Sequence, residues 1–166
     1  MLSICIRITY ESYFLDIDGV VNYVKSRWSF DHVTKTSFLV PEGQNVGWYG
    51  IDPEKVKIIL SIVEKTKAKI VLSSTWRKHE DWLETMALNG FSSELFLGRT
   101  IHNWDFVRGQ EIQIWLDEHR EIEKYAIIDD DSDMLDCQKD SFFQTSFEYG
   151  ITEEIADRVI NHLNKV

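Results

Sequence analysis

The chain has 166 residues, of which 43% are hydrophobic and 28% charged, proportions that suit a globular protein with its own core. Its 28 acidic residues outnumber its 18 basic residues and give a net charge of −10. This charge disfavours a broad groove for duplex nucleic acid, which is lined with Lys and Arg, but it allows a small basic pocket. No apolar run approaches the roughly 18 to 20 residues of a membrane span, so we expect a cytoplasmic protein without membrane contact.

The N-terminal segment "MLSICIRITYESY" has one early Arg and lacks a small-residue cleavage pattern. We therefore expect an edge strand there rather than a secretory signal. Cys5 and Cys137 lie far apart and form no metal-binding spacing, which favours free thiols in a reducing compartment.

Alternating strand and helix patterns follow along the chain. Continuous apolar stretches predict buried strands near residues 13–17, 69–74, 125–129 and 141–146. Helical patterns cover residues 52–68, 108–122 and 152–163, with Asp52 and Thr152 as N-caps and Pro53 in a first turn. This order predicts an α/β fold, in one domain over residues 1–166, with a central parallel sheet flanked by helices. Ligands bind such sheets at the carboxyl ends of the strands.

Residues 21–50 form the irregular part of the predicted domain, and we expect a flap or small hairpin over the sheet edge. Aromatic residues in such a segment most often cover the core. Alternatively, they stack on a nucleobase, as in proteins that bind single strands. The aromatic residues concerned are Trp28, Phe30, Phe38, Trp48 and Tyr49.

The first predicted strand ends in "FLDIDGV", which places two carboxylates where a buried strand stops. Asp16 and Asp18 are two positions apart and point to the same side of an extended backbone, and Gly19 allows a turn and a close approach to a ligand. Burial of an unpaired carboxylate is costly, so the pair needs water, a partner or a cation. The arrangement suits one carboxylate that attacks and a neighbour that moves protons.

The second predicted strand ends in "VLSSTWR". Ser73 and Ser74 offer hydroxyl groups for phosphoryl oxygens, and Arg77 offers a two-pronged donor for a second anionic group. Arg108 precedes the helix that leads into the third strand, and its charge can reach the same strand ends. Taken singly, serines that end a strand are more often helix caps than ligand contacts, and a lone Arg108 is better explained as a surface group.

The third predicted strand ends in "IIDDDSDM", with Asp129, Asp130, Asp131 and Asp133 within five positions. Such a group is mutually repulsive unless a cation intervenes, and hard oxygen ligands suit Mg²⁺. A calcium-binding loop fits less well, because Met134 stands at the sixth position, where the turn requires glycine.

Together these motifs resemble, in order, those of the haloacid dehalogenase (HAD) superfamily of Mg²⁺-dependent phosphotransferases. "DIDGV" resembles the first motif and Ser73 in "VLSS" the second. Arg108 resembles the third, where lysine is more usual, and "IIDDDSD" the fourth. More narrowly, "IVLSSTWR", "RGQEIQIWL" and "GITEEIADRVI" resemble the small phosphatase-like domains of multifunctional RNA repair proteins. The resemblance implies a HAD-like Rossmannoid fold with a minimal cap, the flap alone.

The resemblance also implies roles for the motif residues. Asp16 attacks phosphorus and forms an aspartyl-phosphate, while Asp18 protonates the leaving oxygen and later takes a proton from water. Ser73 and Arg108 bind the transferring phosphoryl group.

Mg²⁺ is the cofactor that the resemblance implies. Its expected ligands are the Asp16 carboxylate, the Asp18 main-chain carbonyl and an aspartate of the fourth motif. The dense acidic sequence permits several registers for that aspartate, and we place Asp130 first, Asp129 second and Asp133 third.

The lengths between motifs bear on the substrate. About fifty residues separate the first two motifs and about thirty the next two, which is too few for a full cap domain. An open site suits a bulky phosphorylated substrate, such as a nucleotide or a polynucleotide 3′-phosphate end, with Ser74, Arg77 and Gly19 in contact with it. The competing hypothesis is a catalytically silent metal-binding regulatory or interaction module on the same scaffold.

Overall fold

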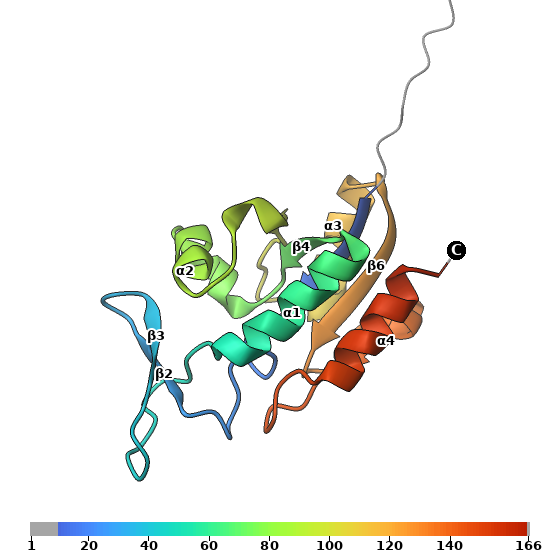
Figure 1. The fold of residues 1–166 in the computed structure, drawn as a ribbon. Coiled ribbons are helices and arrows are strands. Elements are labelled where there is room, and N and C mark those ends of the chain that lie inside the picture. Colours follow the sequence, from blue (N-terminus) through green and yellow to red (C-terminus); the bar gives the residue numbers. More distant parts are fainter. Residues whose placement is uncertain (1–9, 166) are drawn as a thin grey trace, which may run out of the picture.

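A five-stranded parallel sheet forms the centre of the protein in a computed structural model that describes residues 10–165 (Figure 1). The strand order β5-β4-β1-β6-β7 places β1 in the middle. This arrangement confirms the predicted α/β fold with a parallel sheet flanked by helices. The strands are β1 (Tyr10–Leu15), β4 (Lys69–Leu72), β5 (Phe96–Arg99), β6 (Ile122–Asp129) and β7 (Phe142–Gln144).

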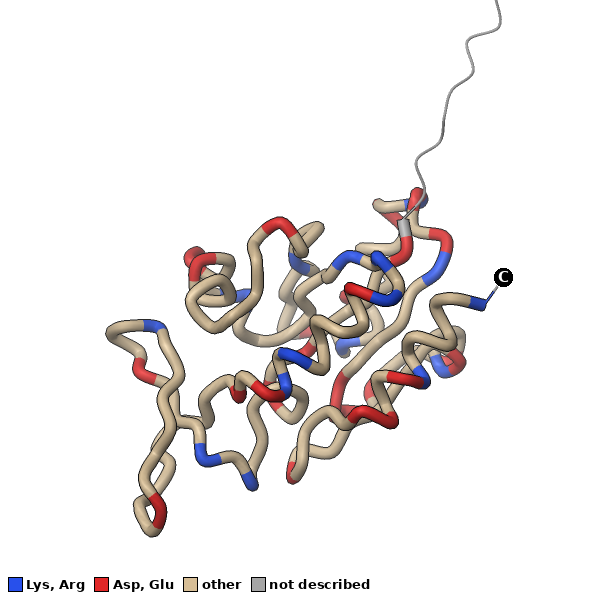
Figure 2. Tube along the Cα trace, viewed as in Figure 1, with Lys and Arg blue, Asp and Glu red and all other residues tan. Residues whose placement is uncertain are grey.

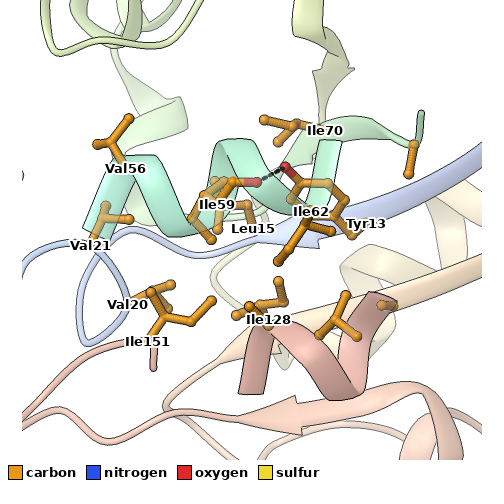
Figure 3. Close-up of a cluster of buried hydrophobic side chains, with 14 of the residues drawn as sticks. Tyr13, Leu15, Val20, Val21, Val56, Ile59, Ile62, Ile70, Ile128 and Ile151 are labelled. Atoms are coloured by element: carbon orange, nitrogen blue, oxygen red, sulfur yellow. Dashed lines mark hydrogen bonds between the residues drawn. The ribbon is translucent and has the colours of Figure 1, made fainter. Parts of the chain in front are cut away.

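Helices cover both faces of the sheet. On one face, α1 (Pro53–Thr66) and α4 (Glu153–Leu163) lie side by side, and α3 (Arg108–Glu118) covers the other (Figure 1). Strand β1 supplies both cores, because successive side chains of a strand point to opposite faces. Tyr13 and Leu15 are buried beneath α1 and α4 (Figure 3), whereas Phe14 packs with Ile112 of α3.

The predicted helix starts are confirmed by their caps. The Asp52 carboxylate accepts a hydrogen bond from the Glu54 amide at 2.9 Å, and the Thr152 hydroxyl accepts one from the Ile155 amide at 3.3 Å. Pro53 occupies the first turn of α1, where its missing N–H costs nothing.

Several short elements were not predicted from the sequence. Strand β5 is only four residues long and contains Gly98, so it offers no continuous apolar run. The others are α2 (Trp82–Leu88) and the 3₁₀ helices η1 (Thr75–Lys78), η2 (Ser93–Leu95) and η3 (Asp136–Ser141).

The edge strand expected at the N-terminus falls mainly on residues 1–9, which, with Cys5, lie outside the described residues. The last residues of that segment belong to β1, which is central rather than at an edge. Cys137 is an exposed free thiol. Within residues 10–165, none of the helices combines the length and apolar character that a membrane crossing requires.

The segment between β1 and α1 contains an antiparallel hairpin, formed by β2 (Trp28–Asp31) and β3 (Thr36–Leu39). The hairpin extends away from the sheet beside α2 (Figure 1). Its two ends meet at its base, where the Asp52 amide donates to the Val21 carbonyl at 2.8 Å and the Tyr23 hydroxyl donates to the Asp52 carboxylate at 2.8 Å. These hydrogen bonds join the two ends of the segment that contains the hairpin, where the chain leaves the sheet and returns to it.

Polar contacts also fix the turn of the hairpin to α2. The Lys35 ammonium pairs with Asp81 and, at 3.3 Å, with Glu84. The Asn89 side-chain oxygen accepts from both the amide and the hydroxyl of Ser37.

The commoner interpretation of the hairpin's aromatic residues, that they cover the core, is wrong for several of them. Trp48 is 70% exposed, and Phe38 and Tyr49 are also exposed. Trp28 and Phe30 are half-buried.

Candidate active site

The carboxyl ends of β1, β4 and β6 meet at one edge of the sheet because these three strands are neighbours in register. Leu15 lies opposite both Leu72 and Ile128. The next amides continue the ladders: Asp16 N–H donates to the Ile128 carbonyl and Ser73 N–H donates to the Leu15 carbonyl, both at 3.0 Å. The polar residues that follow each strand are thereby brought together, as the sequence predicted.

Three carboxylates gather at this edge. Oxygen atoms of Asp16, Asp129 and Asp130 lie within 4.8 Å of one another. Burial raises the pKa of Asp16 well above its usual range, and the charge of Asp129 raises it further. Burial also raises the pKa of Asp129, to about 7, and that of Asp130, beside Asp131.

The donor atoms of this cluster fit Mg²⁺. All are carboxylate oxygens, the hard ligands that the ion prefers. One of them, Asp129 Oδ2, is buried and has no hydrogen-bond partner among the described residues. A divalent cation would favour the charged forms that burial and mutual repulsion now disfavour.

Asp133 lies outside this cluster. Its carboxylate accepts from the Arg108 amide at 3.0 Å, and its carbonyl accepts from the Gly109 amide at 3.3 Å. It therefore satisfies free amides in the first turn of α3, and the expectation that it binds the metal is not met in this geometry.

The backbone conformation and the close packing at this edge of the sheet both favour glycine at position 19. Its φ is +68°, and a Cβ there would lie 2.3 Å from Cγ of Asp130. The close approach expected between Gly19 and a ligand is thus an approach to a carboxylate of the acidic cluster.

Arg108, the first residue of α3, points its guanidinium at the acidic cluster. Its Nη2 lies 3.7 Å from Asp16 Oδ1, and its Nε lies 3.3 Å from Asp129 Oδ2. The sequence predicted that this charge would reach the strand ends.

A buried glutamate one turn along α3 orients that arginine. Glu111 Oε2 lies 3.2 Å from Arg108 Nη1 and 2.5 Å from Arg77 Nη2. Glu111 Oε1 accepts from the Asn103 amide at 2.9 Å and lies 3.4 Å from His102 Nδ1. Glu111 was not among the residues predicted from the sequence, although its position three residues after Arg108 places both on one helix face.

Arg77 is part of this buried network rather than of an open surface. Its side chain is 1% exposed, and the guanidinium donates to the carbonyls of Ser73, Ser74 and Ile101 as well as to Glu111. Burial lowers its pKa. The expected contact between Arg77 and a second anionic group of the substrate is not met, because its donors are bound by protein groups.

The two serines after β4 are both buried but differ in their contacts. The Ser74 hydroxyl hydrogen-bonds to the Asp16 carboxylate, which lowers the pKa of Asp16, and it accepts from the Trp76 amide at 3.5 Å. The Ser73 hydroxyl is buried and has no partner within residues 10–165. Of the two serines, Ser74 is therefore the one whose hydroxyl acts on the Asp16 carboxylate.

Asp18 is held by three donors that the sequence analysis did not identify. Its Oδ1 accepts from Asn22 Nδ2 at 2.7 Å and from Trp76 Nε1 at 3.2 Å, and its Oδ2 accepts from the Thr75 hydroxyl at 3.3 Å. Thr75 and Trp76 directly follow the serines in "SSTWR", so their proximity to the strand end was the available signal.

Two cavities adjoin these residues. The larger, of about 540 Å³, lies between the hairpin and the η1–α2 segment and reaches Asp18. The smaller, of about 130 Å³, is bordered by Arg108, Asp131 and Asp133. Thr75 lines both cavities, which therefore lie on either side of this residue.

A parallel α/β sheet with two aspartates after its central strand, an arginine aimed at them and an acidic pair after the neighbouring strand defines a HAD-type phosphatase fold and site. The chain belongs to the family described as the HAD domain in Swiss Army Knife RNA repair proteins, which it matches over residues 13–156. Membership supports a phosphatase-type hydrolase at the level of the superfamily. No curated protein matches the chain in sequence.

Proposed function

We propose that the protein is a Mg²⁺-dependent phosphomonoesterase that works through an aspartyl-phosphate on Asp16. The observation that carries this proposal is the convergence of Asp16, Asp129, Asp130 and Arg108 at one edge of the sheet. A nucleophile, a cation site and a fixed positive charge are the groups that phosphoryl transfer requires.

In the proposed first step, an oxygen of Asp16 bonds to phosphorus while the ester bond breaks. Asp18 donates a proton to the leaving oxygen. Water then attacks phosphorus and gives its proton to Asp18, and the bond to Asp16 breaks to release phosphate. The three hydrogen bonds to Asp18 hold its carboxylate in place for both proton transfers.

The residues proposed to hold Mg²⁺ are Asp16, Asp130 and Asp129, with the main-chain carbonyl of Asp18. When bound, the ion neutralises charge on the transferring phosphoryl group and on the carboxylates around it. Arg108 supplies a second positive charge beside Asp16.

Hydroxyl donors complete the proposed phosphoryl site. The single hydroxyl proton of Ser74, directed at Asp16 in the free protein, would turn to a phosphoryl oxygen when the substrate binds. Ser73, the residue that the sequence resemblance assigned to this role, remains the alternative donor.

We further propose a nucleotide or polynucleotide 3′-phosphate end as the substrate, hydrolysed in the cytoplasm. The family description, which names RNA repair proteins, supports a phosphorylated nucleic acid. Lys and Arg are scattered among acidic residues along the described trace (Figure 2), an arrangement that suits recognition of an end better than of a long duplex. The exposed thiol of Cys137 fits a reducing compartment.

The test is release of phosphate from p-nitrophenyl phosphate, with and without Mg²⁺. We expect Mg²⁺-dependent hydrolysis by the wild-type protein and background rates for Asp16→Asn, since an amide is a poor nucleophile of nearly the same shape. Asp136→Asn, at an exposed aspartate of η3, is the matched control and should retain activity. Absence of hydrolysis by a folded, Mg²⁺-binding wild-type protein across phosphate esters would favour the silent module.

A further inference from the structure

The larger cavity has aromatic walls that the proposed chemistry does not use. Its lining includes Trp48 and Tyr49 from the hairpin segment and Trp76 and Trp82 from the η1–α2 segment. Its volume of about 540 Å³ lies within the range of about 300 to 1,000 Å³ that is usual for small-molecule sites.

These rings form a continuous path toward the proposed catalytic acid. Edge-to-face contacts run from Trp48 to His32 at 5.3 Å, to Phe30 at 5.1 Å and to Trp76 at 4.8 Å between ring centroids. The path ends at the indole of Trp76, which donates to Asp18. A planar group between the walls would therefore lie next to the group that protonates the leaving oxygen.

The polar lining favours a neutral ligand over a second phosphate. The cavity's lysine, Lys35, is paired with Asp81 and Glu84, and Asp18 contributes a carboxylate at the inner end. The Thr75 hydroxyl, whose proton is donated to Asp18, can still accept a hydrogen bond from a heteroaromatic edge, and the His79 imidazole lies in the same lining.

We propose that this cavity binds the terminal nucleobase of the substrate, unstacked from the rest of the chain. The proposal rests on the function proposed above and specifies its substrate. With the base in the larger cavity, the phosphoryl group would lie on the other side of Thr75, toward Arg108, because Thr75 and Arg108 both line the smaller cavity. Stacking on aromatic side chains is how proteins hold splayed bases of single strands.

A base must leave its pair and its neighbour to enter the cavity, and the cost is smallest at an unpaired end. The enzyme should therefore hydrolyse a 3′-phosphate on a single-stranded oligonucleotide faster than the same 3′-phosphate at a blunt duplex end.

Binding of the base is tested without turnover by titrating ¹⁵N-labelled protein with adenosine and following the tryptophan indole resonances. Ribose is the matched ligand without a base. We expect adenosine, but not ribose, to shift the resonances of Trp48 and Trp76 and to leave that of Trp104 in place. Trp104 is the control because it is 84% exposed and lies outside the cavity lining.

Variants sharpen this test. Trp48→Ala should weaken adenosine binding about 5- to 100-fold, from the usual strength of one base–aromatic stack. Trp48→Phe, which keeps a flat ring, should retain most of the affinity, and Trp104→Ala should retain all of it. Equal shifts with ribose, no shift of a cavity indole, or equal binding by Trp48→Ala and Trp104→Ala would each overturn the proposal.

Hydrolysis separates this inference from the proposed function. Loss of the preference for single-stranded over blunt ends in Trp48→Ala, but not in Trp104→Ala, would support the base site. Hydrolysis with no such preference in the wild-type protein would refute the base site and leave the phosphatase assignment standing. Adenosine binding without any hydrolysis would support the base site and refute the phosphatase assignment.

Discussion

Replacement of Glu111 by Gln removes the single negative charge that two buried or half-buried guanidinium groups share. Glu111 is 2% exposed and lies 2.5 Å from Arg77 and 3.2 Å from Arg108. The amide keeps the shape of the side chain but leaves Arg77 without its paired carboxylate, whereas Arg108 keeps Asp16 and Asp129 beside it.

The magnitude follows from the burial of the pair. Removing one partner of a buried ion pair costs about 3–5 kcal/mol. We expect the low end, about 3 kcal/mol, because the carbonyls of Ser73, Ser74 and Ile101 still accept from Arg77. In a protein of this length, 1 kcal/mol corresponds to about 2–4 °C in Tm, so Glu111→Gln should lower Tm by about 6–12 °C.

Thermal melts followed by circular dichroism at pH 7 measure this change. The matched control is Glu54→Gln in α1, whose partner Lys57 is equally solvent-exposed, and it should stay within about 2 °C of wild type. A Glu111→Gln melt as close to wild type as that of the control would refute the reasoning and mean that water or another group compensates Arg77.

The remaining predictions concern the metal and the turn beside it. Mg²⁺ should raise the Tm of the wild-type protein, and Asp130→Ala should abolish the rise while Asp133→Ala keeps it, as melts with Mg²⁺ and with chelator would show. A rise that survives in Asp130→Ala but disappears in Asp133→Ala would mean that the other register holds the ion. Gly19→Ala and Gly43→Ala both place a side chain at positive φ and should each cost about 1–2 kcal/mol in denaturant unfolding. Only Gly19→Ala should also reduce the Mg²⁺ effect, because open space surrounds Gly43 whereas the new methyl at position 19 meets Asp130, and equal metal responses would contradict this.

The strands buried on both faces were predictable from the sequence because burial on two sides demands an unbroken apolar run. Phe14 and Leu15 show this, since each lies in a different core. Strand β5 escaped prediction because its residues alternate between half-buried and exposed, and α2 because it spans only seven residues.

For the site, the sequence predicted which strand ends would meet but not how each side chain would be used. Spacing alone cannot distinguish Asp130, which enters the cluster beside Gly19, from Asp133, which binds the amides of α3. The prediction for Arg77 was wrong for a similar reason. In the sequence, an arginine close to a motif that binds phosphate is typical of a hydrogen-bond donor to an anionic substrate group. Only the fold reveals that the guanidinium of Arg77 already donates hydrogen bonds to Glu111, which is distant in sequence, and to three main-chain carbonyls.

The hydrogen bond between Asp52 and Val21 joins the two ends of the segment that contains the hairpin, and this segment contributes to the proposed base site rather than to the acidic cluster. About thirty residues leave the sheet after Val21 and return to it at Asp52, and the hydrogen bond between these two residues keeps the exit and the return next to each other. A segment attached in this way tolerates exchange without moving the sheet, provided that Asn22, which donates to Asp18, and Phe30, which packs against Trp76, are kept. Transplanting a hairpin from one homologue to another is therefore a route to new substrate preferences on an unchanged hydrolytic centre.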